Sequence, residues 1–256
     1  MPKKGRTKKD LEEFSKRVQE HIEREKKAKG GALLSDIILG GQDGLVNVLG
    51  IVLGVASATN DRYLVIIAGL VATFAESVSM AAVAYSSVRA EQDHYRRELE
   101  QEKWEIEHLP EIEREEIKLI YMRKGLRGRE LAQMVKSVTK NKELWLSVMM
   151  SEELGLSPIE RSNPVKAALI VGVSAIIGSI IPLIPFFFFQ ASESIAFSLI
   201  ISTLSLFAFG AYKAKVTVGN WFKSGIEMVS VGMAAAIVGY LVGKLLGDWV
   251  GLQNLA

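Results

Sequence analysis

The chain has 256 residues, of which 49% are hydrophobic and 23% are charged, and its formal net charge is +2. Its mean hydropathy of +0.21 averages over long apolar runs and separate charged segments, which is the pattern of an integral membrane protein. The absence of cysteine excludes disulfides and thiolate metal sites, and the basic N-terminal stretch lacks the apolar core expected of a cleavable signal peptide.

Residues 1–30 are dense in Lys and Arg interleaved with Glu, which predicts a solvated cytoplasmic helix or tail. The alternative is a basic segment that contacts anionic lipid. The first apolar stretch, residues 35–58, is long enough to span a bilayer and carries Asp43 near its middle, with five glycines around it. An ionisable residue inside a membrane span is costly and indicates a function. Small residues at four-residue spacing indicate a helix packed closely against a partner.

A short link leads to the second predicted span, residues 63–87, and a polar block follows at residues 89–162. This block is too charged for a bilayer, and we expect it to form a small helical domain. Pro110 should end its first helix, because proline interrupts a helix interior. Gly125 should close the second helix, and one or two further helices should end at Gly155.

Three more spans are expected at residues 164–189, 195–211 and 225–246. Basic residues gather at the N-terminus, in the polar block and in the link between the last two spans. The positive-inside rule therefore places the N-terminus in the cytoplasm and the C-terminus outside. The fold class is an all-α membrane protein with five transmembrane helices and a cytoplasmic helical domain between spans two and three. The predicted organisation is an N-terminal segment (1–30), spans one and two (31–88), the helical domain (89–162), spans three to five (163–247) and an external tail (248–256).

Polar residues at one-turn spacing lie inside the predicted membrane. Asp43 is followed by Asn47, and Glu76 is followed by Met80. Residues four apart share a helix face, so each pair could offer two ligands to one ion. Glu227, near the inner end of the last span, is a further candidate. The alternative for Asn47 and Glu227 is that they only hydrogen-bond neighbouring helices.

The polar block carries glutamates at helical spacing, and the segment WLSVMMSEELGL near its end adds methionines. The candidates are Glu98, Glu102, Glu105, Glu113, Glu116, Met149, Met150, Glu152 and Glu153. Such a glutamate run alone is usually a solvated face, but we expect the methionine pair to be exposed beside it. Carboxylates accept many divalent ions, whereas thioethers favour softer transition metals. A mixed site would therefore suit ferrous iron better than magnesium or calcium.

Several separated motifs, in this order, resemble the vacuolar iron transporter family, including its prokaryotic members, over about residues 30–250. They are DIILGGQDGLVNVLGIVLGVASA, LVIIAGLVA, SMAAVAYSSVRAE, MMSEELGL, NPVKAALIVGVSAIIGSIIPLIPF, GAYKAKVT and GIEMVSVGMAAAIVGYLVG. The resemblance implies a homodimer that exports Fe²⁺, and also Mn²⁺, Co²⁺ or Zn²⁺, from the cytosol in exchange for protons. We expect no enzymatic activity, no prosthetic group and no nucleic-acid partner. A compact chain without a targeting segment predicts a prokaryotic plasma membrane, and a vacuolar membrane is the alternative.

The resemblance also implies roles for residues. In that family the metal path runs between the first spans of two subunits. Asp43 and Met80 would be the transport residues on this path, and the glycines around Asp43 would let the two copies approach. Metal would be collected by Glu102, Glu105, Glu113, Glu116, Met149, Met150 and Glu153 of the cytoplasmic domain. Relatives often carry a glutamate where this chain has Ala84, and Glu76 is the expected substitute.

Two rival functions use the same residues differently. One is a membrane-anchored iron-oxidising or storage module built on the glutamates with His94 and His108. Both histidines end Glu-x-x-His elements, but on one predicted helix, whereas di-iron bundles take these elements from different helices. The other rival is a metal sensor that transports nothing. Both leave Asp43 without a role.

Overall fold

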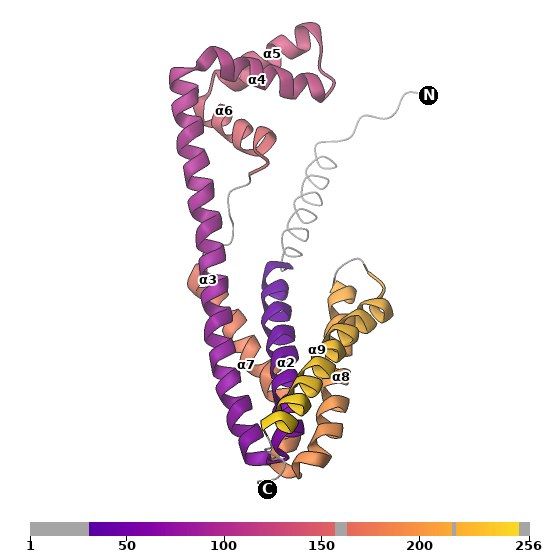
Figure 1. The fold of residues 1–256 in the computed structure, drawn as a ribbon. Coiled ribbons are helices and arrows are strands. Elements are labelled where there is room, and N and C mark those ends of the chain that lie inside the picture. Colours follow the sequence, from indigo (N-terminus) through magenta and orange to yellow (C-terminus); the bar gives the residue numbers. More distant parts are fainter. Residues whose placement is uncertain (1–30, 157–162, 217–218, 251–256) are drawn as a thin grey trace, which may run out of the picture. The chain divides into compact units, whose positions relative to one another are not determined.

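The structure is a computed structural model that describes residues 31–156, 163–216 and 219–250. Within these ranges every regular element is a helix and no strand occurs (Figure 1). The predicted N-terminal segment, residues 1–30, lies outside the described residues, as do residues 251–256 of the predicted tail. The chain divides into two compact units. We call Met1–Ala84 with Val165–Ala256 the apolar unit, and Tyr85–Pro164 the polar unit.

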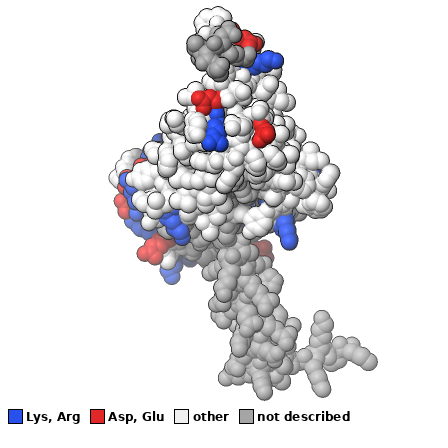
Figure 2. Space-filling model, turned by 90° about the horizontal axis from the view of Figure 1, so that it is seen from below, with Lys and Arg blue, Asp and Glu red and all other residues white. Residues whose placement is uncertain are grey.

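Five helices are long and apolar enough to cross a membrane. They are α2 (Gly31–Thr59), α3 (Arg62–His108), α7 (Pro164–Phe188), α8 (Ala191–Val216) and α9 (Trp221–Val250). Many large apolar side chains on them are exposed, among them Val71, Phe74 and Leu204 at 60–66%. Figure 2 shows a face on which charged residues are few and scattered among uncharged ones. Exposed apolar surface of this extent fits helices that contact lipid.

The second predicted span and the first predicted polar helix are one helix, because α3 runs without a break for 47 residues. No glycine or proline lies between Gly69 and Pro110, so nothing ends the helix where its composition changes from apolar to charged. Only Pro110 stops it, and this residue then begins the next helix, α4 (Pro110–Arg123), in the first turn where proline is tolerated.

The centre of the apolar unit is α2, whose side chains Leu45, Val48, Leu49, Val52 and Leu53 are at most 1% exposed. Its glycines allow close packing inside the same chain. A Cβ at Gly44 would collide with the carbonyl oxygen of Ala175 on α7, and one at Gly54 would lie 2.9 Å from that of Gly239 on α9. Helices of the same chain thus pack closely beside Gly44 and Gly54, and whether glycines of α2 also let a second copy approach stays a prediction.

The polar unit contains α4, α5 (Gly128–Thr139), α6 (Lys142–Val148) and the π-helix η1 (Met149–Glu153). Its small core is formed by Ile106, Ile117, Ile120, Val138, Trp145 and Met149. Gly125 follows α4 with a φ of +99°, which only glycine adopts without strain. The side chain of Asn141 caps α6 by accepting hydrogen bonds from the backbone N–H groups of Glu143 and Leu144. These turns fold α4, α5 and α6 back on one another.

Candidate metal sites

Three glutamates of the polar unit bring their carboxylate oxygens together. Glu102 and Glu105 come from α3 and Glu113 from α4, and one oxygen from each lies within 4.8 Å of the others. Glu102 and Glu105 share a helix face because they are three residues apart. The reversal of the chain at Pro110 supplies the third carboxylate. We call these three residues the glutamate cluster. Carboxylate oxygens at such spacing suit a divalent cation.

Two members of the glutamate cluster are buried, and one carboxylate oxygen of each lacks a hydrogen-bond partner among the described residues. Glu102 is 5% exposed and Glu113 is 2% exposed, and the Oε2 atom of each has no hydrogen-bond partner among the described residues. A buried and unpartnered carboxylate is costly, so each group needs a proton or a cation. Burial, followed by repulsion from Glu153, raises the pKa of Glu102 to about 7. Burial, followed by repulsion from Glu116, raises the pKa of Glu113 to about 8.

The other predicted glutamates surround the cluster with negative charge. Partial burial and then the nearby Glu116 and Glu105 raise the pKa of Glu153. Glu98 differs, because its carboxylate already pairs with Arg97 at 2.7 Å and lies 3.4 Å from His94. Glu116 and Glu153 are thus placed to assist the cluster, whereas Glu98 is largely neutralised by its neighbours.

The methionine pair is buried rather than exposed, contrary to the sequence-based expectation. Met149 is 0% and Met150 2% exposed, and Met149 packs in the core with Trp145. Both begin the π-helix η1, a feature often found at functional sites. Glu152 points elsewhere, since its carboxylate pairs with Lys124 at 2.5 Å. Met149 is thus first of all a core residue, and its role as a thioether ligand stays a prediction.

A second polar group lies within the apolar unit. The Asn47 side chain donates a hydrogen bond of 3.3 Å to the Asp43 carboxylate, and both side chains lie near that of Glu76 on α3. The structure thus brings Asp43 and Glu76 near each other from different helices, a proximity that no spacing in the sequence reveals.

The remaining membrane candidates are less closely connected. Met80 is half-buried one turn after Glu76 on α3, and Ala84 follows after a further turn. Glu227 is exposed on α9, and no hydrogen bond or ion pair among the described residues joins it to Asp43. An open groove of about 800 Å³ runs along the surface where α2 packs against α9. Its walls include Asn47, Gly50, Ile51 and Val55 of α2 and Ala235, Gly239 and Gly243 of α9.

The two histidines of the rival iron-oxidising function are not brought into one site. His94 lies beside Glu98. His108 stacks on Trp104 with ring centroids 4.5 Å apart. Both histidines are exposed, and neither belongs to the glutamate cluster. The described residues therefore offer no support for a histidine-containing di-iron centre.

Comparison with known proteins gives consistent matches over most of the chain. A family model described as the VIT family matches residues 34–244. The protein named vacuolar iron transporter 1 in Tulipa gesneriana is 32% identical over 228 residues, which cover 89% of this chain and 92% of that protein. Its namesake in Arabidopsis thaliana is 30% identical, with 87% and 89% covered. The vacuolar iron transporter of Plasmodium falciparum is 33% identical, with 93% and 90% covered.

Proposed function

The chain belongs to the VIT family, and from this premise we propose that it carries ferrous iron out of the cytosol in exchange for protons. Its relatives are named transporters, and it is a membrane transporter rather than an enzyme. Iron is accordingly its substrate and not a resident cofactor. Mn²⁺, Co²⁺ and Zn²⁺ are further candidate substrates, because glutamate and methionine ligands accept them as well. The membrane is that of a prokaryotic cell, with the N-terminus inside.

The observation that carries the proposal is that Asp43 of α2, which is hydrogen-bonded by Asn47, lies near Glu76 of α3 inside the apolar unit. A carboxylate that binds a metal ion must first lose its proton. The pair can therefore hold either a shared proton or a divalent cation, which is the exchange that an antiporter requires. Met80 lies on the same helix face as Glu76 and would supply a soft ligand.

The transport cycle has three steps. The glutamate cluster, assisted by Glu116 and Glu153, captures the ion on the cytoplasmic side. The ion then replaces the proton held by Asp43 and Glu76. Protons from the opposite side return to these carboxylates and release the ion. The path is shared between two copies of the chain, and the open groove between α2 and α9 is the surface that the second copy would cover.

The test is proton-coupled metal flux in liposomes that contain the full chain. Asp43→Ala should abolish Fe²⁺ or Mn²⁺ flux and the accompanying proton movement, while the protein stays folded and dimeric. Asp248→Ala is the matched control, because Asp248 is an exposed carboxylate at the end of α9. Flux at the wild-type rate in Asp43→Ala would refute the exchange step. A monomer with full flux would refute the shared path.

A further inference from the structure

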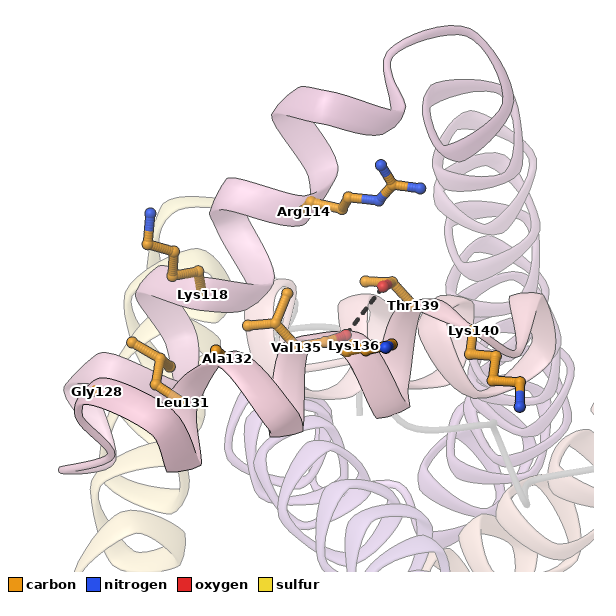
Figure 3. A pocket seen from close by; sticks show the side chains of 9 residues that line it. All are labelled: Arg114, Lys118, Gly128, Leu131, Ala132, Val135, Lys136, Thr139 and Lys140. Carbon is orange, nitrogen blue, oxygen red and sulfur yellow. Dashed lines mark hydrogen bonds between the residues drawn. The ribbon is translucent and has the colours of Figure 1, made fainter.

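A second cavity lies in the polar unit, in an open groove between α4 and α5 (Figure 3). Its volume of about 670 Å³ falls within the range of small-molecule sites. Nine residues line it, and none of them is acidic. Leu131, Ala132 and Val135 form an apolar floor along α5. None of the nine belongs to the glutamate cluster, so this cavity is separate from the metal site.

Basic side chains flank the floor in two pairs. Arg114 and Lys118 are four residues apart on α4 and share a helix face. Lys136 lies on α5, and Lys140 directly follows the last residue of that helix. Glu111 pairs with Arg114 at 3.0 Å and Glu115 with Lys118 at 2.7 Å. Four cations less these two carboxylates leave a net charge of +2. Lys136 and Lys140 have no ion-pair partner in the part of the chain that the structure describes.

We propose that this groove binds a soluble nucleoside polyphosphate, with its phosphates between the two basic walls and its base on the apolar floor. The planar guanidinium of Arg114 suits phosphate oxygens, and Lys136 supplies a cation from the opposite side of the same groove. A floor of three aliphatic side chains covers one heterocyclic ring. It would leave the acyl chains of a phospholipid in water, which the hydrophobic effect disfavours.

The test measures binding of ATP to the detergent-solubilised full chain by calorimetry, in buffer with EDTA and without divalent metal. We expect saturable binding of ATP, weaker binding of inorganic triphosphate and none of adenosine. Lys136→Glu and Lys140→Glu should each weaken ATP binding about tenfold or more, as expected for a lost charge-assisted contact. Ala132→Asp, which places a negative charge on the exposed part of the floor, should weaken it as well.

Arg129→Glu is the matched control, since it changes the charge of α5 by the same amount at an exposed residue outside the groove. It should leave ATP affinity unchanged. An equal loss in Arg129→Glu would overturn the proposal, because the attraction would then be diffuse. So would triphosphate affinity equal to that of ATP, the absence of saturable ATP binding, or Lys136-dependent binding to phosphatidylglycerol vesicles alone. Mn²⁺ binding to each variant reports that the polar unit is folded.

The result of the ATP-binding test does not depend on the proposed transport function. ATP binding should persist in Asp43→Ala, and metal flux should persist in Lys136→Glu. If Asp43→Ala loses flux and the wild type binds no ATP, the transport proposal stands and only the nucleotide site is refuted.

Discussion

Metal capture by the glutamate cluster should release protons, and Glu113→Gln should remove most of that release. At pH 7, Glu102 with a pKa of about 7 is half protonated, and Glu113 with a pKa of about 8 holds its proton in roughly nine molecules of ten. An ion that needs both carboxylates ionised would thus displace about 1.4 protons. The glutamine variant has no proton to lose at position 113, so its release should fall to about 0.5.

The same values fix the direction and size of the pH dependence. Raised pKa values keep the carboxyls protonated as pH falls, so affinity must fall between pH 8 and pH 6. Protonation of each carboxyl divides the metal affinity by one plus the ratio of its protonated to ionised forms. The combined divisor for Glu102 and Glu113 is roughly 1,100 at pH 6 and about 2 at pH 8, which predicts roughly 500-fold weaker metal binding at pH 6. Glu153, whose pKa is also raised, would add to this dependence.

The assay is calorimetric titration of Mn²⁺ or Co²⁺ into the full chain, in buffers of different ionisation enthalpy so that released protons are counted. An Asp43→Ala background removes binding at the membrane pair. Glu100→Gln, an exposed residue of α3, controls for the change of charge. Affinity that is constant from pH 6 to pH 8, or unchanged proton release in Glu113→Gln, would refute the assignment of these protons to the cluster.

Three further predictions concern packing and the thioether. Gly44→Ala should unfold or strongly destabilise the protein, because the added Cβ would collide with the Ala175 carbonyl oxygen. In the control Gly41→Ala, the added Cβ lies 3.7 Å from its nearest neighbour, the Ser174 carbonyl oxygen, so the melting temperature should equal that of the wild type. Met150→Leu conserves volume and should cost less than about 1.5 kcal/mol in the free energy of unfolding, yet weaken Co²⁺ binding if the sulfur is a ligand. Asn141→Ala should cost about 1 kcal/mol in thermal unfolding through loss of the α6 cap.

The helices were largely predictable because their ends are chemically marked. Pro110 and Gly125 bound α4, and long apolar stretches mark the candidate spans. The sequence does not predict the continuity of α3, because the change from apolar to charged residues along it resembles a boundary between two helices. A helix has no reason to end where its side chains change from apolar to charged, since each backbone N–H still finds the carbonyl four residues earlier.

Residue identities at the candidate site were easier to predict than their surroundings. Glutamates at spacings of three and four indicate a shared face, but contact between Glu113 and the α3 glutamates depends on how the chain reverses at Pro110. The burial of Met149 had a usable signal, because Trp145 lies four residues earlier and large apolar residues at that spacing usually face a core. The proximity of Asp43 to Glu76 had none, since helix pairing is set by tertiary packing.

Because α2 packs through its glycines against helices of the same chain, only part of its surface is open to a second copy. Gly44 is covered by α7, so this face of α2 is closed to a partner. The side that stays open is the groove, whose wall includes Asn47. Because Asn47 is hydrogen-bonded to Asp43, a partner that fills the groove would approach the carboxylate pair through this amide. Asn47 would then be the first polar group that an ion meets between two subunits, rather than only a bond between helices.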